Sequence, residues 1–251
     1  MIVTFTDFGI EGPYMGQMRA AIYGEAPGIQ VVDLMVDAPS FDPRSAAYLL
    51  PAVMQPLPEE TVCLAVIDPG VGSRRVPIIL RADNRWYVGP DNGLFEIIAR
   101  RSESIPEWWE ITYAPDKLTA SFHGRDQFAP VAAKISKAGN GALAGIAREY
   151  TPDRSPYTKW PDDIAEVIYI DGYGNCMLGT RWSMLTNGFS IELPSGMIGR
   201  ARTFSDVSEG KAFCYENAMG LVEIAVNRGH AAAKLGLEVG SQVAVRKLSG
   251  K

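Results

Sequence analysis

The sequence predicts an α/β N-terminal domain with a mostly parallel sheet, followed by a smaller, mostly β, barrel-like C-terminal domain. Three observations support this prediction. Apolar strand patterns alternate with helical ones in the first part of the chain, a proline-containing stretch follows, and strand patterns then continue to the end. We expect the α/β domain to cover residues 1–157 and the β domain residues 158–251.

The chain opens with a strand–helix–strand–helix–strand pattern, which favours a parallel sheet with right-handed crossovers. Pro27–Gly28 should end the first helix, and Asp42 should cap the second. The expected elements are a strand Ile2–Thr6, a helix Tyr14–Glu25, a strand Gln30–Leu34, a helix Pro43–Met54 and a strand Val62–Ile67. No loop carries the G-x-G-x-x-G pattern of dinucleotide-binding folds.

The remainder of the first domain begins with a hairpin that turns at Asp83–Asn84. Asp126 is predicted to be the N-cap of a later helix that Gly139 ends. The stretch Glu107–Tyr113 fits neither a helix nor a strand clearly. The other expected elements are the strands Val76–Leu80 and Trp86–Val88 and the helices Leu94–Arg101 and Gln127–Lys137.

The second domain follows a linker at about 150–163, where Pro152, Pro156 and Pro161 interrupt regular structure. A tight turn is expected at Asp171–Asn175. The predicted strands are Ala165–Ile170, Phe189–Leu193, Leu221–Val226 and Gln242–Val245.

Composition bounds the class of protein. The 251 residues are 47% hydrophobic and 21% charged, as in globular proteins. A net charge of -5 disfavours a broad nucleic-acid-binding face, and no apolar run approaches the ~20 residues of a membrane span. Without a visible signal peptide, and with three scattered cysteines (Cys63, Cys176 and Cys214), the expected location is cytoplasmic.

The segment Asp68–Arg75 is the strongest candidate for a site. It places a carboxylate at the end of a buried strand, and the arginines Arg74 and Arg75 follow a sharp Pro/Gly turn. Ligands bind at that edge in open α/β sheets. The alternative is an ordinary turn with solvated arginines.

Histidine is scarce, with His123 in a Gly-flanked loop before a helix and His230 at an expected helix start. A near-neutral pKa suits His123 to proton transfer, although a loop histidine is more often a surface residue. We expect no metal site, because zinc and iron sites usually need several converging histidines or cysteines.

Four carboxylates lie at or near predicted strand ends or in breaker loops: Asp7, Asp33, Asp68 and Asp91. Each could simply cap a turn. Together they would suit a pocket for a polyol or cationic ligand. Phe8, Phe41 and Tyr173 could supply stacking walls, or they could belong to the core.

Over nearly its whole length the chain resembles the S-adenosylmethionine (SAM) hydroxide adenosyltransferases, which are related to fluorinase and chlorinase enzymes. The similarity rests on the order and spacing of short motifs: Thr6–Gly9, Asp68–Arg75, Gly89–Gly93, Phe122–Asp126, Asp171–Asn175 and Leu221–Asn227. The family has an α/β domain followed by a β domain, and it forms homotrimers that hold the substrate between domains of neighbouring subunits.

The resemblance implies the hydrolysis of SAM to adenosine and methionine without a cofactor. It implies a catalytic set of Asp68, Arg75 and His123. For the substrate it implies Asp7 at the ribose hydroxyls, Phe8 and Phe41 as aromatic neighbours, Asp171 at the amino group, and Tyr173 and Asn175 at adenine. The halogenating relatives carry Tyr and Ser at the positions of Asp68 and Gly124, so this chain points towards water as the nucleophile.

The sequence also departs from the family pattern. Gly12 stands where relatives often have Asp, no histidine follows the second strand, and Ala218 replaces a serine that meets the methionine carboxylate. Two alternatives therefore stay open: a halide-using enzyme, and a non-catalytic protein that binds SAM or adenosine.

Overall fold

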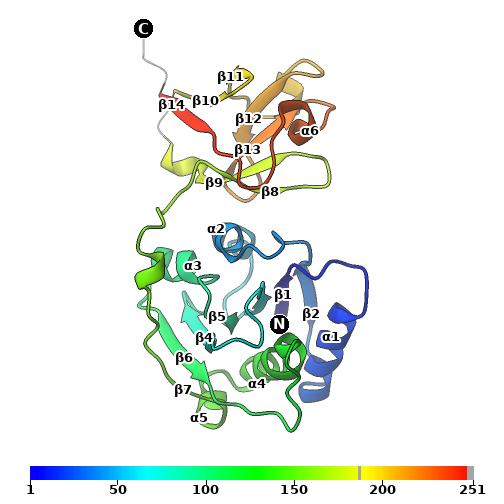
Figure 1. Ribbon diagram of the computed structural model, residues 1–251, viewed down its shortest axis with the longest axis vertical. Coiled ribbons are helices and arrows are strands. Elements are labelled where there is room, and N and C mark those ends of the chain that lie inside the picture. The colour runs from blue at the N-terminus through cyan, green and yellow to red at the C-terminus, as the bar shows by residue number, and fades with distance from the viewer. Residues whose placement is uncertain (186–187, 248–251) are drawn as a thin grey trace. The chain divides into compact units, whose positions relative to one another are not determined.

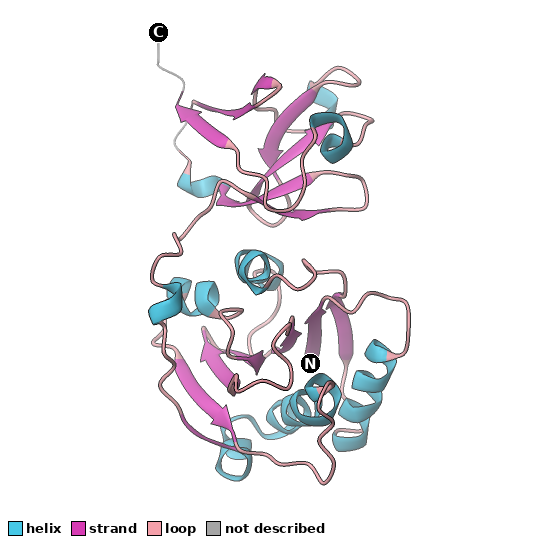
Figure 2. Ribbon diagram, in the orientation of Figure 1, coloured by secondary structure: helices cyan, strands magenta, loops and turns pink. Residues whose placement is uncertain are grey.

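The protein, described as a computed structural model for residues 1–185 and 188–247, consists of two compact units (Figures 1 and 2). The first unit comprises Met1–Leu50 and Pro56–Trp160. The second comprises Pro51–Gln55 and Pro161–Lys251.

The first unit is built on a mixed sheet of seven strands in the order β2-β1-β3-β5-β4-β6-β7. Strands β2, β1, β3 and β5 are parallel to one another, whereas β4, β6 and β7 join by antiparallel pairing. The strands are β1 (Ile2–Thr6), β2 (Val31–Met35), β3 (Val62–Val66), β4 (Pro77–Ala82), β5 (Arg85–Pro90), β6 (Glu107–Ile111) and β7 (Ala147–Glu149).

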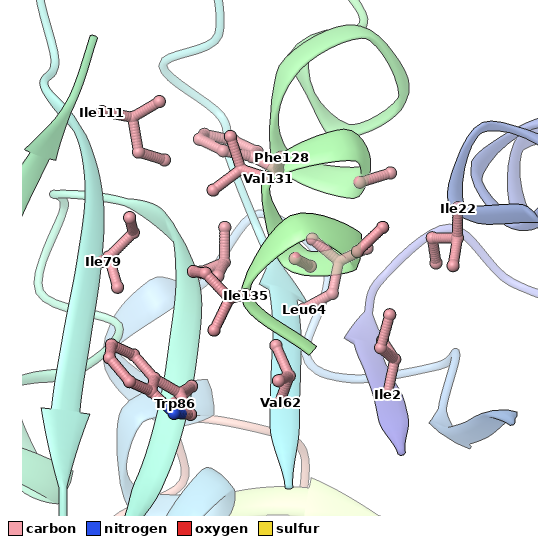
Figure 3. Close-up of a cluster of buried hydrophobic side chains, with 14 of the residues drawn as sticks. Ile2, Ile22, Val62, Leu64, Ile79, Trp86, Ile111, Phe128, Val131 and Ile135 are labelled. Carbon is pink, nitrogen blue, oxygen red and sulfur yellow. The ribbon is translucent and has the colours of Figure 1, made fainter. Parts of the chain in front are cut away.

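Helices lie on both faces of this sheet (Figure 1). They are α1 (Tyr14–Glu25), α2 (Pro43–Met54), α3 (Glu96–Arg101), α4 (Ala129–Ala138) and the short α5 (Leu143–Ile146). In Figure 3 Val131 and Ile135 of helix α4, together with Phe128 just before it, lie over apolar side chains of the central strands. Alternate β3 residues therefore enter this cluster, and Cys63 and Ala65 between them are buried on the opposite face.

Local sequence signals fix several of these elements. The amide of Ser45 donates to the Asp42 carboxylate at 3.0 Å, so Asp42 caps α2 as predicted. Asp83 and Asn84 both have positive φ, 47° and 57°, which is typical of the tight turn expected between β4 and β5. The ambiguous stretch from Glu107 forms strand β6, because its backbone pairs with β4.

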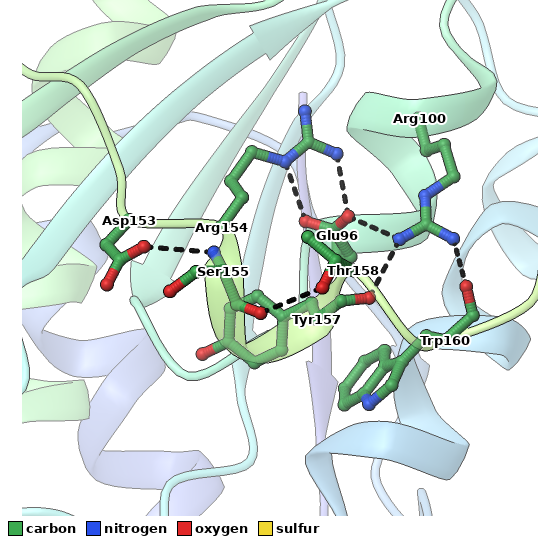
Figure 4. Close-up of polar contacts among 8 residues, drawn as sticks. All are labelled: Glu96, Arg100, Asp153, Arg154, Ser155, Tyr157, Thr158 and Trp160. Atoms are coloured by element: carbon green, nitrogen blue, oxygen red, sulfur yellow. Dashed lines mark hydrogen bonds and ion pairs between the residues drawn. The ribbon is translucent and has the colours of Figure 1, made fainter.

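The proline-containing segment after β7 is anchored to the first unit rather than forming a free linker. Glu96, 5% exposed, accepts hydrogen bonds from Arg100 at 2.7 Å and from Arg154 at 2.8 and 2.9 Å (Figure 4). Arg100 also donates to the carbonyls of Tyr157 and Trp160. One buried carboxylate thus holds the segment through two guanidiniums.

The second unit contains two antiparallel sheets, β11-β10-β14 and β12-β13-β9-β8. Single bridges at Glu166–Gln242 and Arg200–Cys214 join them at both edges, which gives the barrel-like closure that was expected. The elements are β8 (Val167–Ile170), β9 (Cys176–Arg181), β10 (Phe189–Leu193), β11 (Gly196–Ile198), β12 (Ala212–Glu216), β13 (Leu221–Val226), α6 (Ala231–Leu235) and β14 (Ala244–Lys247). Apolar side chains from both sheets share one core.

Candidate functional site

One cavity of about 370 Å³ in the first unit collects several of the predicted site residues. It lies where β1 and β3 end, at the carboxyl edge of the parallel strands, as open α/β sheets lead one to expect. Its lining residues are Asp7, Phe8, Tyr14, Phe41, Val66, Asp68, Val71, Ser121, Phe122, His123 and Gly124.

The loop after β3 brings Arg75 back onto Asp68. The Arg75 Nε lies 2.9 and 3.1 Å from the two carboxylate oxygens, and its Nη2 lies 2.6 Å from Oδ2. Both side chains are buried, at 9% and 5% exposure. Gly72 makes the loop possible, since its φ is +79° and a Cβ there would lie 2.8 Å from the carbonyl oxygen of Ala120.

The imidazole of His123 completes this constellation. Arg75 Nη2 lies 2.9 Å from His123 Nδ1. A guanidinium only donates, so Nδ1 must accept and the proton of the neutral ring sits on Nε2. Burial and then the positive charge of Arg75 lower the pKa of His123, which favours the neutral ring.

Asp126 is not the N-cap that the sequence suggested. A π-helical turn, Gly124–Phe128, precedes α4, and Asp126 lies inside it. Its carboxylate instead accepts from Arg125 at 2.6 Å and from the Thr119 amide at 2.8 Å. Burial opposes ionisation, but these hydrogen bonds outweigh it and lower the pKa of Asp126 to about 2. The carboxylate thereby fixes the loop that carries His123.

Asp7 and Phe41 are joined across the mouth of the cavity. The Phe41 amide donates to Asp7 Oδ2 at 3.0 Å, while Phe41 as a whole is 78% exposed. Burial raises the pKa of Asp7, and the hydrogen bond from Phe41 partly opposes that shift. Phe41 has a φ of +58°, a left-handed conformation that is uncommon for a bulky residue.

The other two carboxylates of the expected edge lie elsewhere. Asp33 is inside β2, where it accepts from Thr4 and pairs with Arg19 at 2.7 Å. Asp91 accepts from the Tyr150 hydroxyl at 2.7 Å and does not line the cavity. The expectation that all four acids share one pocket is therefore wrong, because Asp33 lies within β2 and Asp91, which directly follows β5, pairs with Tyr150 instead.

The predicted residues of the β domain line a separate cavity of about 650 Å³ in the second unit. Asp171 accepts from the amides of Tyr173 and Asn175, both at 2.9 Å, and from the Asn175 side chain at 3.0 Å. The carboxylate thus shapes the predicted turn, and Tyr173 is left 80% exposed. His230 stands at the start of α6 as predicted, and its side chain caps the helix by accepting from the Ala233 amide.

Sequence reasoning missed Glu223 in this cavity. It is 2% exposed and accepts from the Tyr215 hydroxyl and, at 2.8 Å, from the side-chain amide of Asn217. Burial raises the pKa of Glu223, against the hydrogen bonds from Tyr215 and Asn217. The available signal was an acid inside the apolar run Leu221–Val226, which is the kind of position that needs a partner.

Tyr14 and Phe122 in the first cavity were also missed as site residues, although Phe122 adjoins His123 in the sequence. A larger cavity of about 800 Å³, lined by Trp182 and Arg200 among others, contains none of the predicted residues. Among residues 1–185 and 188–247, no group of three or more His, Cys, Asp or Glu side chains is placed to hold a metal ion. In the same part of the chain, no helix is long and apolar enough to cross a membrane.

Comparison with known proteins identifies the family. The SAM hydroxide adenosyltransferase N-terminal domain matches residues 2–145, and the C-terminal domain of the same family matches residues 165–244. The chain belongs to the SAM hydroxide adenosyltransferase family.

Relatives in this family match the chain almost end to end. The (R)-S-adenosyl-L-methionine hydrolase of Thermus thermophilus is 38% identical over 95% of this chain and 96% of its own length. The protein of the same name from Salinispora arenicola is 34% identical, with 96% and 95% covered.

Solved structures agree with the fold. An uncharacterized conserved protein from Thermotoga maritima matches with a TM-score of 0.86 at 27% identity, over 98% of this chain and all of its own. A conserved hypothetical protein from Thermus thermophilus matches with a TM-score of 0.76 at 33% identity, over 98% and 99%.

Proposed function

We propose that this protein hydrolyses (R)-S-adenosyl-L-methionine to adenosine and L-methionine. The name and similarity of the relatives support the substrate. The observation that carries the chemistry is that Arg75 contacts both Asp68 and His123, which line one small cavity. We propose these three as the catalytic residues.

The proposed reaction is a displacement at C5′ of the ribose. The oxygen of a water molecule bonds to C5′, the C5′–S bond breaks, and sulfur keeps the electron pair as a neutral thioether. Water has a pKa near ~15.7, so the attacking oxygen needs a group that accepts its proton as the bond forms. The cavity supplies Asp68 for this step.

The tautomer of His123 gives different roles to the side chains of His123 and Asp68. Its Nδ1 is occupied by Arg75, so the remaining Nε2–H is a donor that orients water rather than a base. Asp68 is then the proton acceptor, and Arg75 holds its carboxylate in place with three contacts. The step removes the negative charge of the Asp68 carboxylate and the positive charge of the sulfonium. A poorly solvated site favours such a step, in which opposite charges disappear.

Substrate contacts form part of the proposal. Asp7 would accept from the ribose hydroxyls, since Phe41 occupies only its Oδ2, and Phe8 and the exposed ring of Phe41 would pack against the nucleoside. In the second unit Tyr173 and Asn175 would meet adenine, and Asp171 would face the ammonium group. We further propose a homotrimer with the site between subunits, a cytoplasmic location and no cofactor.

The direct test incubates purified protein separately with the (R) and (S) epimers of SAM and follows adenosine and methionine by chromatography. We expect equal amounts of the two products, faster from the (R) epimer, with no loss after dialysis against a chelator. Absence of adenosine from both epimers would refute hydrolysis. A mixture of Asp7→Ala and Asp171→Ala proteins, refolded together, should regain part of the activity if sites combine neighbouring subunits.

A halide-using enzyme is disfavoured by the carboxylate of Asp68 in the cavity, because an acid repels an incoming anion. The formation of 5′-chloro-5′-deoxyadenosine in the presence of chloride would reverse that conclusion. A non-catalytic binding protein would hold SAM without turnover, and His123→Ala would leave its affinity unchanged.

A further inference from the structure

Three aromatic rings form a compact group beside the proposed catalytic residues. The centroids of Phe8, Tyr14 and Phe122 lie 5.4 to 5.9 Å apart, and the ring planes are inclined by 55° to 89°. Such tilted and edge-on contacts hold rings in fixed orientations. The group joins the loop after β1, the start of α1 and the loop that carries His123.

This group is the partition between two cavities. All three rings line the cavity of Asp68 and His123, and all three also line an adjacent cavity of about 470 Å³. Arg125 lines only the adjacent cavity, and its Cζ lies 5.0 Å from the centroid of the Phe122 ring. The guanidinium of Arg125 therefore contacts the Phe122 ring from the adjacent cavity, and Asp126 is its counterion at 2.6 Å.

The charges around the first cavity favour a positive ligand. Arg75 pairs with Asp68, and the lowered pKa of His123 keeps that ring neutral at neutral pH. Among the residues that the structure describes at this cavity, the carboxylate of Asp7 has no cationic partner and accepts from backbone amides such as that of Phe41. The three aromatic rings line the same cavity, and the face of an aromatic ring carries a negative quadrupole.

We infer that the wall of Phe8, Tyr14 and Phe122 recognises the sulfonium charge of the substrate and discriminates against the uncharged thioether. The inference rests on the proposed function and adds to it a determinant of specificity. Aromatic walls bind onium groups through cation–π attraction, worth more where water is excluded. SAM and S-adenosylhomocysteine differ at sulfur by one methyl group and this charge, so they make a matched pair of ligands.

The wall should act on binding rather than on the chemical step. The positive charge is complete in the bound substrate and disappears as the C5′–S bond breaks, so the attraction is strongest before reaction. An interaction of this kind lowers KM and does not raise kcat. It also disfavours the neutral thioether of the product methionine, which helps product release.

Tyr14 is the ring that can best be removed without damage to the fold. It is the first residue of α1 and is 52% exposed. Tyr23 lies on the same helix, is 43% exposed and lines neither cavity, so Tyr23→Leu is a matched control. Tyr14→Phe keeps the ring and removes only the hydroxyl.

The experiment measures dissociation constants of SAM and S-adenosylhomocysteine by calorimetric titration, in a His123→Ala background that slows turnover. Tyr14→Leu should weaken the binding of SAM about fivefold and that of the thioether less than twofold. Tyr14→Phe and Tyr23→Leu should keep the ratio of the two constants. Phe122→Leu should shift the ratio in the same direction, and thermal melting will confirm that each variant is folded.

Equal weakening of both ligands by Tyr14→Leu would overturn the inference, since the ring would then contribute shape alone, while the proposed function would stand. An unchanged ratio in Phe122→Leu would overturn it as well. If the parent protein binds neither ligand, the proposed function falls and the inference falls with it.

Discussion

Asp68 in the first unit and Glu223 in the second are both buried acids at the wall of a cavity, but their partners differ. Asp68 is bound by the guanidinium of Arg75. Glu223 is held by a hydroxyl and an amide, which are neutral donors. The comparison teaches that burial alone does not define the role of an acid, because a cationic partner compensates a buried negative charge more fully than neutral donors do.

The largest effect should come from breaking the ion pair of the first unit. Arg75→Met leaves Asp68 buried without its counterion, which should lower the free energy of unfolding by about 3–5 kcal/mol. The loss of electrostatic support should lower kcat/KM by on the order of 10²-fold or more. Denaturant unfolding and steady-state kinetics measure the two effects.

The adjacent Arg74 is exposed and provides the control. Arg74→Met should change stability by less than about 0.5 kcal/mol and leave the rate unchanged. Equal losses in both variants would mean that the pairing of Asp68 with Arg75 has no special role.

The pH dependence of the rate sharpens the comparison. The pKa of His123 is lowered, so its neutral form persists below the usual histidine value of about 6.5. Activity should stay level as the pH falls through 6.5 and decline only at lower pH, where a protonated ring would face Arg75. A rate profile for kcat measured between pH 5 and 8 tests this, and half-maximal activity above pH 7 would contradict it.

A smaller effect should follow from Asp126→Asn. Its pKa is lowered to about 2, so the carboxylate stabilises the fold above its unfolded pKa, and this contribution is lost as the pH falls towards 2. At neutral pH the variant should lose about 1 kcal/mol of stability, with a moderate fall in rate because the loop of His123 loosens. Unfolding experiments at pH 7 and pH 3 give the difference in free energy of unfolding between the parent protein and the variant. We expect this difference to be smaller at pH 3, and a larger difference at pH 3 would contradict the prediction.

The smallest change, and one of opposite sign to the first, is expected for Glu223→Gln. A raised pKa means that the ionised acid is penalised in the folded state at high pH. Replacing the acid by an uncharged amide should therefore leave the free energy of unfolding at pH 8 unchanged or raise it by up to about 1 kcal/mol. This gain should vanish near pH 4, where the acid itself is protonated. The variant Asp68→Asn should lower the free energy of unfolding at pH 8. If both variants changed the free energy of unfolding in the same direction, the distinction between Asp68 and Glu223 would be lost.

Local signals in the sequence predicted most of the fold. The Asp42 cap, the Asp83–Asn84 turn and the spacing of α1 act over a few residues, so they can be identified without the structure. Strands β7, β9, β11 and β12 were not predicted, because their place depends on pairing with other strands.

The candidate site was predicted in part for the same reason. Asp7, Asp68 and His123 follow strand ends or precede a helix, and the structure brings them to one cavity. The capping role given to Asp126 was wrong, since tertiary hydrogen bonds draw its side chain to Thr119 inside a π-helical turn. The function of these residues stays a prediction until the variants are measured.

Phe41 keeps a left-handed backbone while its amide holds Asp7. A glycine at this position would relax the chain and remove the ring, and a β-branched residue would remove the ring and add further steric conflict. If the ring packs against the nucleoside as proposed, backbone relaxation and substrate contact are opposed at position 41, and homologues adapted to different temperatures should differ there.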